Sequence, residues 1–303
     1  MVRSLDWWGV GLALLAQVLS YVGSGYLLQA VVALTGQRLP LLAAVEITLA
    51  ASSVGLVSAG ILGDAAASYR WTRTYGIRPA GALLGSWMPT LFNLCLLFAL
   101  ALLGLADLLL LHALSSEEAW GFGGSLAALV CAAALAVWTV VRPERIARVL
   151  AWLSERLPGV PRIGSATVEE GFRRLSGAFT LLRHGGWRRV LLGALGNTGF
   201  DLLTLYLLFH AAGSPLPPDV LTTGYGLPLL LGKVVLLPGG LGAVEGGMVA
   251  LYHALGVPVP TAVLVVLSYR AISFWLPTLV GVPLVPLLER RTLRGPAPAS
   301  DAR

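Results

Sequence analysis

The sequence predicts an all-α protein that crosses a membrane about eight times. Hydrophobic residues make up 56% of the 303 residues and charged residues only 12%, whereas soluble domains carry about 25% charged residues. The mean hydropathy is +0.80. Apolar stretches of about 20 residues recur along the chain, and each is long enough to cross a hydrocarbon core about 30 Å thick as a helix. They lack the strict alternation of membrane β-strands.

Six of the predicted spans are uninterrupted, and two elements near the C-terminus are less regular. The short, glycine-rich seventh element either crosses or re-enters, and the long eighth contains three prolines. Residues 1–288 thus form one transmembrane domain, and residues 289–303, rich in Pro, Ala and Ser, form a disordered cytoplasmic tail. The predicted segments are Trp8–Leu34, Leu41–Leu62, Ala80–Leu105, Trp120–Val141, Val190–Ala211, Val220–Leu237, Gly242–Leu255 and Thr261–Leu288.

Positive charge concentrates in one loop. Residues 142–189 contain ten arginines against four glutamates, and basic loops of membrane proteins face the cytoplasm. Apolar residues at helical spacing within the loop predict amphipathic helices in the headgroup plane; two soluble helices packed on each other are the alternative. With an even number of crossings, the N- and C-termini both face the cytoplasm, in a multi-pass protein of the inner membrane.

Two segments, one in each half of the chain, share an order of features that indicates an internal repeat. Each has a glycine-rich break with a carboxylate, then a glycine turn, then a long span. Asp64 precedes Gly76 by 12 residues, and Glu245 precedes Gly256 by 11. Paired interruptions of this kind are the best sequence pointer to a transporter's binding site.

The second break, Pro238–Gly242, has a physical use at membrane depth. Unwound backbone is tolerated there only where it lines a cavity or meets protein or ligand. A helix that starts after the break presents free N–H groups and the positive end of its dipole, which suits a phosphate. Close helix packing is the alternative role of these glycines. The segment lacks the G-x-x-x-x-G-K-[ST] spacing of a nucleotide-binding loop.

Asp201, Lys233 and Arg270 are charged residues that fall inside predicted spans. Asp201 and Arg270 lie at similar depth, and an isolated charge there costs at least about 2.5 kcal/mol on insertion scales. Both therefore need partners, either as an ion pair with each other or as part of a polar path for a headgroup or proton. Lys233 lies near the end of its span, where snorkelling explains it as well as contact with an anionic ligand does.

Three motifs follow one another in the C-terminal part of the chain. They are P-G-G-x-G-x-x-E at Pro238–Glu245, an L-G-V turn at Leu255–Val257, and Y-R-x-x-[ST]-[FY]-W-x-P at Tyr269–Pro277. In this order they resemble the family of the lysylphosphatidylglycerol synthase transmembrane region, also called flippase-like. Upstream, Gly63-Asp64 followed by Arg70 resembles the family's G-[DE]-x-x-R element. Here the arginine follows the acid by six residues rather than three.

The resemblance implies an eight-span module that moves a phospholipid headgroup between leaflets. The aminoacyltransferase domain that follows this module in bifunctional synthases is expected to be absent, so we expect no enzymatic activity. The expected ligand is an anionic lipid or a polyprenyl-phosphate-linked sugar, without cofactor, metal or nucleic acid. The predicted ligand-binding residues are Asp64, Arg70, Asp201, Lys233, Pro238, Gly239, Gly240, Gly242, Glu245 and Arg270.

Two other functions fit the same residues. The protein could be a non-catalytic subunit that binds a membrane glycosyltransferase or lipid-modifying enzyme. It could also be an intramembrane enzyme that acts on a lipid carrier, although its four histidines are scattered and no H-E-x-x-H or G-x-S-x-G pattern is present.

Overall fold

Four helical stretches in the described part of the chain are long and apolar enough to cross a membrane. The computed structural model describes residues 6–58, 60–111, 186–234 and 238–293, with isolated residues between 120 and 131. The described chain is all-helical, as predicted. The four stretches are α1 (Trp7–Ala33), most of α4 (Pro79–Leu111), α8 (Trp187–Ala211), and the run from α11 (Val259–Arg270) through a π-helical turn (Ala271–Trp275) to α12 (Leu276–Leu293).

The chain divides into two units, residues 1–111 with 188–303, and residues 112–187. The second unit falls almost wholly outside the described residues. The predicted span Trp120–Val141 and the amphipathic helices of the basic loop therefore lie largely or wholly outside them too. The description below concerns the first unit.

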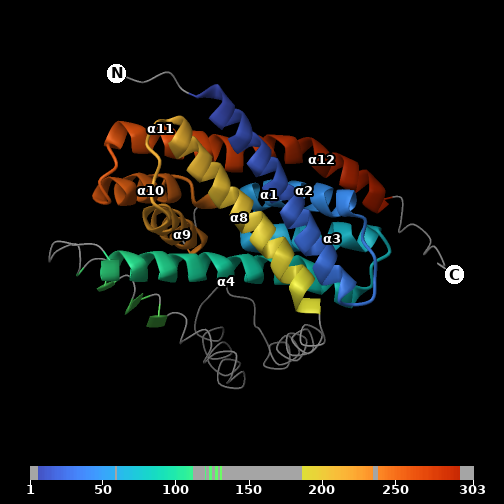
Figure 1. The fold of residues 1–303 in the computed structure, drawn as a ribbon. Coiled ribbons are helices and arrows are strands. Elements are labelled where there is room, and N and C mark those ends of the chain that lie inside the picture. The colour runs from blue at the N-terminus through green and yellow to red at the C-terminus, as the bar shows by residue number, and fades with distance from the viewer. Residues whose placement is uncertain are drawn as a thin grey trace, which may run out of the picture. The chain divides into compact units, whose positions relative to one another are not determined.

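Helices α1 and α8 pack antiparallel along their length, the blue and yellow helices that cross side by side in Figure 1. Small residues permit this close approach. A Cβ added at Gly23 would lie 2.6 Å from the amide nitrogen of Asn197, and one at Gly193 would lie 2.7 Å from Leu27 Cα. Halfway along the pair, Ser20 Oγ donates to the Asn197 carbonyl at 2.8 Å.

Helices α2 (Leu41–Val57) and α3 (Ile61–Thr74) form the first re-entrant hairpin. The chain reverses at Gly60, whose φ of +56° is easily adopted only by glycine. Because α2 starts at the end of α1 and α3 ends where α4 begins, the hairpin enters and leaves at one end. The Arg78 amide confirms this closeness by donating to Gln37 Oε1 at 3.1 Å.

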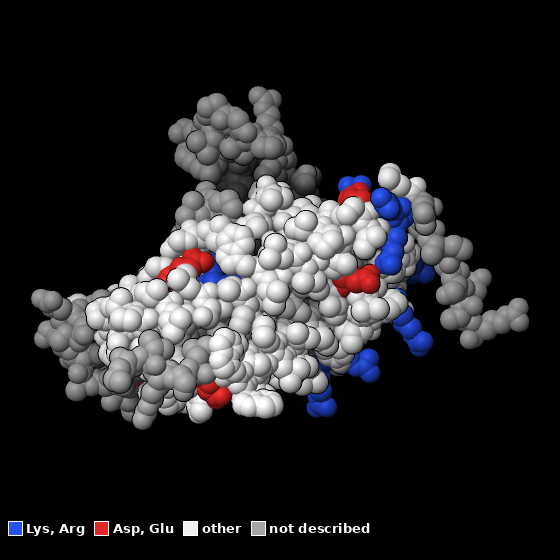
Figure 2. All heavy atoms as spheres, turned by 90° about the horizontal axis from the view of Figure 1, so that it is seen from above, with Lys and Arg blue, Asp and Glu red and all other residues white. Residues whose placement is uncertain are grey.

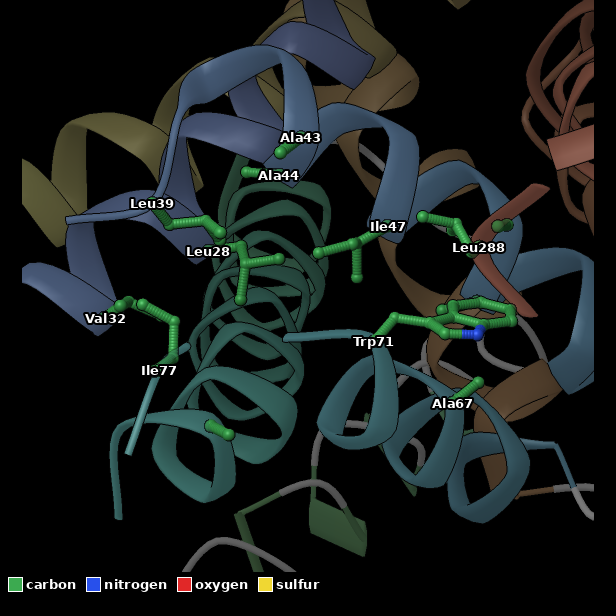
Figure 3. Close-up of a cluster of buried hydrophobic side chains, with 13 residues drawn as sticks. Leu28, Val32, Leu39, Ala43, Ala44, Ile47, Ala67, Trp71, Ile77 and Leu288 are labelled. Atoms are coloured by element: carbon green, nitrogen blue, oxygen red, sulfur yellow. The ribbon is translucent and has the colours of Figure 1, made fainter. Parts of the chain in front are cut away.

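A buried apolar cluster holds the open end of this hairpin (Figure 3). Trp71 of α3 is 1% exposed and packs with residues of α1, α2 and α12. Burying a side chain of this size contributes on the order of 2–3 kcal/mol. The labelled members are Leu28, Val32, Leu39, Ala43, Ala44, Ile47, Ala67, Trp71, Ile77 and Leu288.

The second hairpin consists of α9 (Pro218–Val234) and α10 (Ala243–Ala254), joined through the 3₁₀ turn Pro238–Gly240. Tyr252, near the end of α10, donates its hydroxyl hydrogen to the Leu221 carbonyl near the start of α9 at 3.1 Å. This hairpin therefore also enters and leaves at one end. The predicted element Gly242–Leu255 re-enters rather than crosses.

The two hairpins open at opposite ends of the unit. The start of α9 packs against the end of α4, since Gly104 faces Thr223, whereas the first hairpin opens at the start of α4. Each hairpin is followed by a long helical run, α4 or α11–α12. The prediction of two glycine-broken or re-entrant elements is confirmed, and the segments Leu41–Leu62 and Val220–Leu237 are arms of hairpins rather than crossings.

The turns that leave the hairpins share one geometry, which supports the internal repeat. Tyr75 has φ −88° and ψ 18°, and Leu255 has φ −88° and ψ 16°. The next residues, Gly76 and Gly256, have φ of +76° and +88°. The matching side-chain contacts are Arg73 Nη1 donating to the Ile77 carbonyl at 2.6 Å and His253 Nδ1 with the Val257 carbonyl at 3.3 Å.

Described arginines gather at the end of the unit where α1 and α12 finish, which we call the basic end. Figure 2 shows the blue side chains collected at one end of a largely uncharged face. Ion pairs join neighbouring elements there, as Arg291 Nη1 donates to Glu46 Oε2 at 3.1 Å and to the hydroxyl oxygen of Tyr75. Burial raises the pKa of the Tyr75 hydroxyl, so it stays neutral near pH 7.

Two predictions about the ends of the chain are wrong. The start of α1 lies beside the end of α8, with the Asp6 amide donating to the Ala211 carbonyl, and this is the end opposite the basic end (Figure 1). The described ends of the chain therefore cannot both face the cytoplasm. The predicted tail is helical as far as Leu293, because Glu289 and Arg291 anchor this last turn through ion pairs.

Candidate functional site

The closed tips of the two hairpins meet inside the unit. The short helices α3 and α10 have 14 and 12 residues and so extend about 20 Å, half the length of the 27-residue α1. A Cβ added at Gly239 would lie 3.1 Å from Leu56 Cδ1 of α2. Asp64 of α3 also interacts electrostatically with Lys233 of α9. Backbone from both hairpins is thus adjacent about halfway between the two ends.

Each short helix begins at its tip, so two helix N-termini face the middle of the unit. Gly60 and Gly242 precede them, with φ of +56° and +80°. The first amides of a helix have no partner within it, and they carry the positive end of the helix dipole. Each first turn also carries one carboxylate, Asp64 or Glu245.

Glu245 links the second break to the last long helical run. Its Oε2 accepts the Gly242 amide hydrogen at 2.7 Å, so it supplies the glutamate half of a capping box, while Gly242 has no side chain to supply the other half. Its Oε1 accepts from Arg270 Nε at 2.6 Å. The carboxylate thus holds the start of α10 against α11.

Arg270 is 6% exposed and is the charged residue at the centre of the site. Besides Glu245, its Nη2 donates to the Gly239 carbonyl at 3.1 Å, and its guanidinium lies 4.1 Å from the centre of the Phe274 ring. These contacts join the arginine to the unwound segment at Gly239, to the first turn of α10 at Glu245 and to the π-helical turn at Phe274. A buried charge deprived of its partner would cost about 3–5 kcal/mol.

The helical run changes to a π-helical turn, Ala271–Trp275, immediately after Arg270. Such turns are rare and occur often at functional sites. Sequence accounts for part of this one, since Pro277 has no N–H to donate to the Ser273 carbonyl four residues earlier. The Tyr21 hydroxyl of α1 donates to that carbonyl instead, at 2.7 Å.

The predicted ion pair between Asp201 and Arg270 is wrong. Asp201 Oδ2 accepts hydrogen bonds from the hydroxyls of Tyr225 at 2.7 Å and Tyr269 at 2.6 Å, while Arg270 is committed to Glu245. Similar depth along the membrane did not bring the two charges into contact, because Tyr269 and Arg270 are consecutive and point about 100° apart around α11.

The structure brings most of the remaining predicted residues to the hairpin tips, with one exception. Gly239, Gly240 and Gly242 form the break that Pro238 begins. Arg70 is not part of the site, because it lies in the second half of α3 and pairs with Glu289 of α12 at 2.6 Å, with its side chain 54% exposed.

Sequence reasoning assigned no role to Gln17, Tyr21, Tyr225, Tyr269 or Phe274. The first four gather around Asp201 or the π-helical turn, and Phe274 covers Gly239 and Arg270. A signal was available, since polar groups of aromatic residues inside a span need hydrogen-bond partners. That signal identifies the need for a partner but not the partner.

A known protein family matches nearly the whole chain. The sequence profile described as "Lysylphosphatidylglycerol synthase TM region" matches residues 1–281. A UPF0104 membrane protein of Methanothermobacter thermautotrophicus is 36% identical over 86 residues, 28% of this chain and 25% of that protein. A UPF0104 membrane protein of Pyrococcus horikoshii is 35% identical over 95 residues, which are 31% of this chain and 28% of that protein. One of Methanocaldococcus jannaschii is 30% identical over 91 residues, which are 30% of this chain and 27% of that protein. The matches span about a quarter of the length of these relatives.

Proposed function

Because the chain belongs to the family of the lysylphosphatidylglycerol synthase TM region and is an integral, multi-pass membrane protein, we propose that it moves a lipid with an anionic phosphate headgroup between leaflets. The observation that carries the proposal is the buried Arg270–Glu245 pair at the tip of a re-entrant hairpin. Glycerophospholipids and polyprenyl-phosphate-linked sugars share the required phosphate.

The site offers a phosphate two kinds of donor. Arg270 carries five N–H groups in a fixed fork, and guanidinium binds phosphate bidentately. The first amides of α10 lie beside it, where a helix N-terminus favours an anion. Glu245 pairs with Arg270 in the structure, so an arriving phosphate exchanges with the carboxylate. The arginine then never remains buried without a negative partner.

The opposed hairpins suit a site that opens toward each end in turn. Each closes the path on its own side with a short helix and a glycine-broken tip, which is the arrangement of repeats that transporters use for alternating access. Movement of one hairpin would open the site toward one leaflet while the other keeps it closed. We propose transport rather than catalysis as the activity of this chain.

Charge sets the proposed orientation. We place the protein in the inner membrane. The basic end, which includes the C-terminal end of α12, then faces the cytoplasm. The start of α1 then lies on the opposite side.

The test compares Glu245→Gln with wild type in phosphatidylcholine vesicles that contain NBD-labelled phosphatidylglycerol. Glutamine keeps the size of the side chain and one acceptor for Arg270, so we expect the variant to keep its fold at reduced stability, but it lacks the charge that exchanges with phosphate. We expect transbilayer movement of the labelled lipid to fall at least tenfold. Wild-type movement in this variant would mean that the site assignment is wrong.

Two controls make the result specific. Glu289→Gln removes the carboxylate of the exposed Arg70–Glu289 pair, and its movement should equal that of wild type. NBD-labelled phosphatidylcholine, whose headgroup has no net charge, should move more slowly than the anionic probe. A polyprenyl-phosphate probe distinguishes the two lipid classes.

A further inference from the structure

Asp201 is a membrane-embedded acid that the headgroup site does not use. Its side chain is partly buried on α8, and among the described residues no basic side chain forms an ion pair with it. Among the described residues, the positive charge that acts on it is Arg270, and that guanidinium is bound to Glu245 at 2.6 Å. The partners of Asp201 are therefore neutral.

Three elements surround the carboxyl group with groups that exchange hydrogen bonds. Tyr225 of α9 and Tyr269 of α11 both donate to Oδ2, at 2.7 and 2.6 Å. From α1, Gln17 and Tyr21 lie close enough to interact with the same carboxyl group. With both hydroxyls on Oδ2, the other oxygen, Oδ1, is the position where a proton fits.

Gln17 is suited to both protonation states of this acid. It is 4% exposed, and its Oε1 has no hydrogen-bond partner among the described residues. An amide carries donors and an acceptor, and their assignment follows the hydrogen-bond network. Its NH₂ group donates to Asp201 when the acid is ionised, and its Oε1 accepts the O–H of Oδ1 when the acid is neutral. A proton on Asp201 thus gives the orphaned acceptor its missing donor.

We propose that Asp201 is an exchangeable proton-binding site, whose carboxylate takes up one proton at Oδ1 and releases it as the protein changes its access state. The reaction is proton transfer from water or hydronium, and no other bond is made or broken. The proton reaches a group next to Tyr269, which precedes Arg270 directly. Proton binding and headgroup binding therefore act on consecutive residues of α11, which is the coupling that proton-driven transport requires.

The test is infrared difference spectroscopy of the full chain in lipid vesicles, recorded between acidic and alkaline buffer. The neutral acid has a carboxyl C=O band that the carboxylate lacks. We expect wild type to gain this band on acidification, and Asp201→Asn to lose it. Absence of the band in wild type, or a band that Asp201→Asn leaves unchanged, would overturn the proposal. A band of constant intensity across the accessible pH range would also overturn it, because that acid would not exchange its proton.

Tyrosine variants assign the band without depending on the folding of Asp201→Asn. A hydrogen bond to a carbonyl lowers its stretching frequency, so Tyr225→Phe should move the band to higher frequency. Tyr252→Phe is the matched control, because this buried hydroxyl bonds to the Leu221 carbonyl, and the band should stay in place. If Tyr225→Phe left the frequency of the band unchanged, the proton would lie on another group.

The role of the proton in transport rests on the proposed function, but the proton site does not. If labelled lipid stays immobile while the band titrates and disappears in Asp201→Asn, the proposed function fails and the proton site stands.

Discussion

Arg270 depends on a single carboxylate, and this makes the energy of the pair measurable. Removing one partner of a buried pair leaves the other without compensation and costs about 3–5 kcal/mol. Arg270→Gln should therefore lower the thermal stability strongly, and Glu245→Gln should do so less, because Arg270→Gln also removes the hydrogen bond to the Gly239 carbonyl and the contact with the Phe274 ring. The double variant should lose less than the sum, with a coupling energy of about 1–3 kcal/mol.

A second cycle on the same chain gives the reference value. Arg70 and Glu289 are also 2.6 Å apart, but their side chains are 54% and 33% exposed, and exposed pairs contribute about 0–1 kcal/mol. Equal coupling energies in the two cycles would contradict the buried environment assigned to Arg270.

The sequence identifies which side chains need partners at this scale, but not which partners they find. Glu245 was predicted as a site residue because it follows a glycine break, and Arg270 because an isolated charge is costly at membrane depth. Their pairing depends on the angle at which each side chain leaves its helix and on which helices are neighbours. Asp201 and Arg270 lie at similar depth. Only the packed structure shows that tyrosines donate to Asp201 and that Glu245 pairs with Arg270.

At the scale of elements, a substitution at Gly239 tests whether the Pro238–Gly242 break requires the backbone conformation of this glycine. Its φ is +63°, and a Cβ would collide with the Phe274 ring that covers Arg270. Gly239→Ala should therefore lower the melting temperature by several degrees and slow movement of the labelled lipid. Both effects have the same cause, because shifting Phe274 disturbs the guanidinium beneath it.

Gly246 is the matched control for this substitution. It lies within α10, and a Cβ there would meet nothing within 4 Å. Alanine improves helix propensity by about 1 kcal/mol relative to glycine. Gly246→Ala should therefore keep or raise the melting temperature. A loss equal to that of Gly239→Ala would mean that added volume anywhere near the tip is harmful.

Hairpins were harder to predict than helices because length alone does not distinguish an arm from a crossing. Helices α2 and α9 each have 17 residues, at the lower limit of a membrane span. The glycines marked the places where the chain breaks. Whether it reverses there depends on packing, such as that of Trp71 on Ile47 or Tyr252 on α9.

For the whole molecule, the arrangement predicts opposite exposure of two groups of positions. Trp7 and Ala254 lie at one end of the unit, and Arg38 and Arg290 lie at the other. Single cysteines are introduced as Trp7→Cys, Ala254→Cys, Arg38→Cys and Arg290→Cys in a background in which Cys95 and Cys131 are replaced by alanine. A membrane-impermeant thiol reagent applied outside intact cells should label the first pair only. Labelling of Trp7→Cys and Arg290→Cys from the same side would contradict the fold described here.

The predicted side of the N-terminus is wrong because the number of membrane crossings was counted wrongly. An even number of crossings followed from treating every apolar stretch as a crossing, whereas each hairpin returns the chain to the side from which it came. The positive charge itself was interpreted correctly as clustering at one end, since Arg38, Arg78, Arg189 and Arg291 come from four separate parts of the sequence.

The opposed entry of the two hairpins has an electrical consequence. Helices α3 and α10 both point their N-termini at the middle, so their dipoles run in opposite directions along the membrane normal. A helix dipole of about half a charge across half the bilayer is worth roughly 0.5 kcal/mol per 100 mV of membrane potential. The field stabilises one helix by nearly the amount that it destabilises the other. While both hairpins keep these positions, their two short helices together therefore contribute almost no voltage dependence.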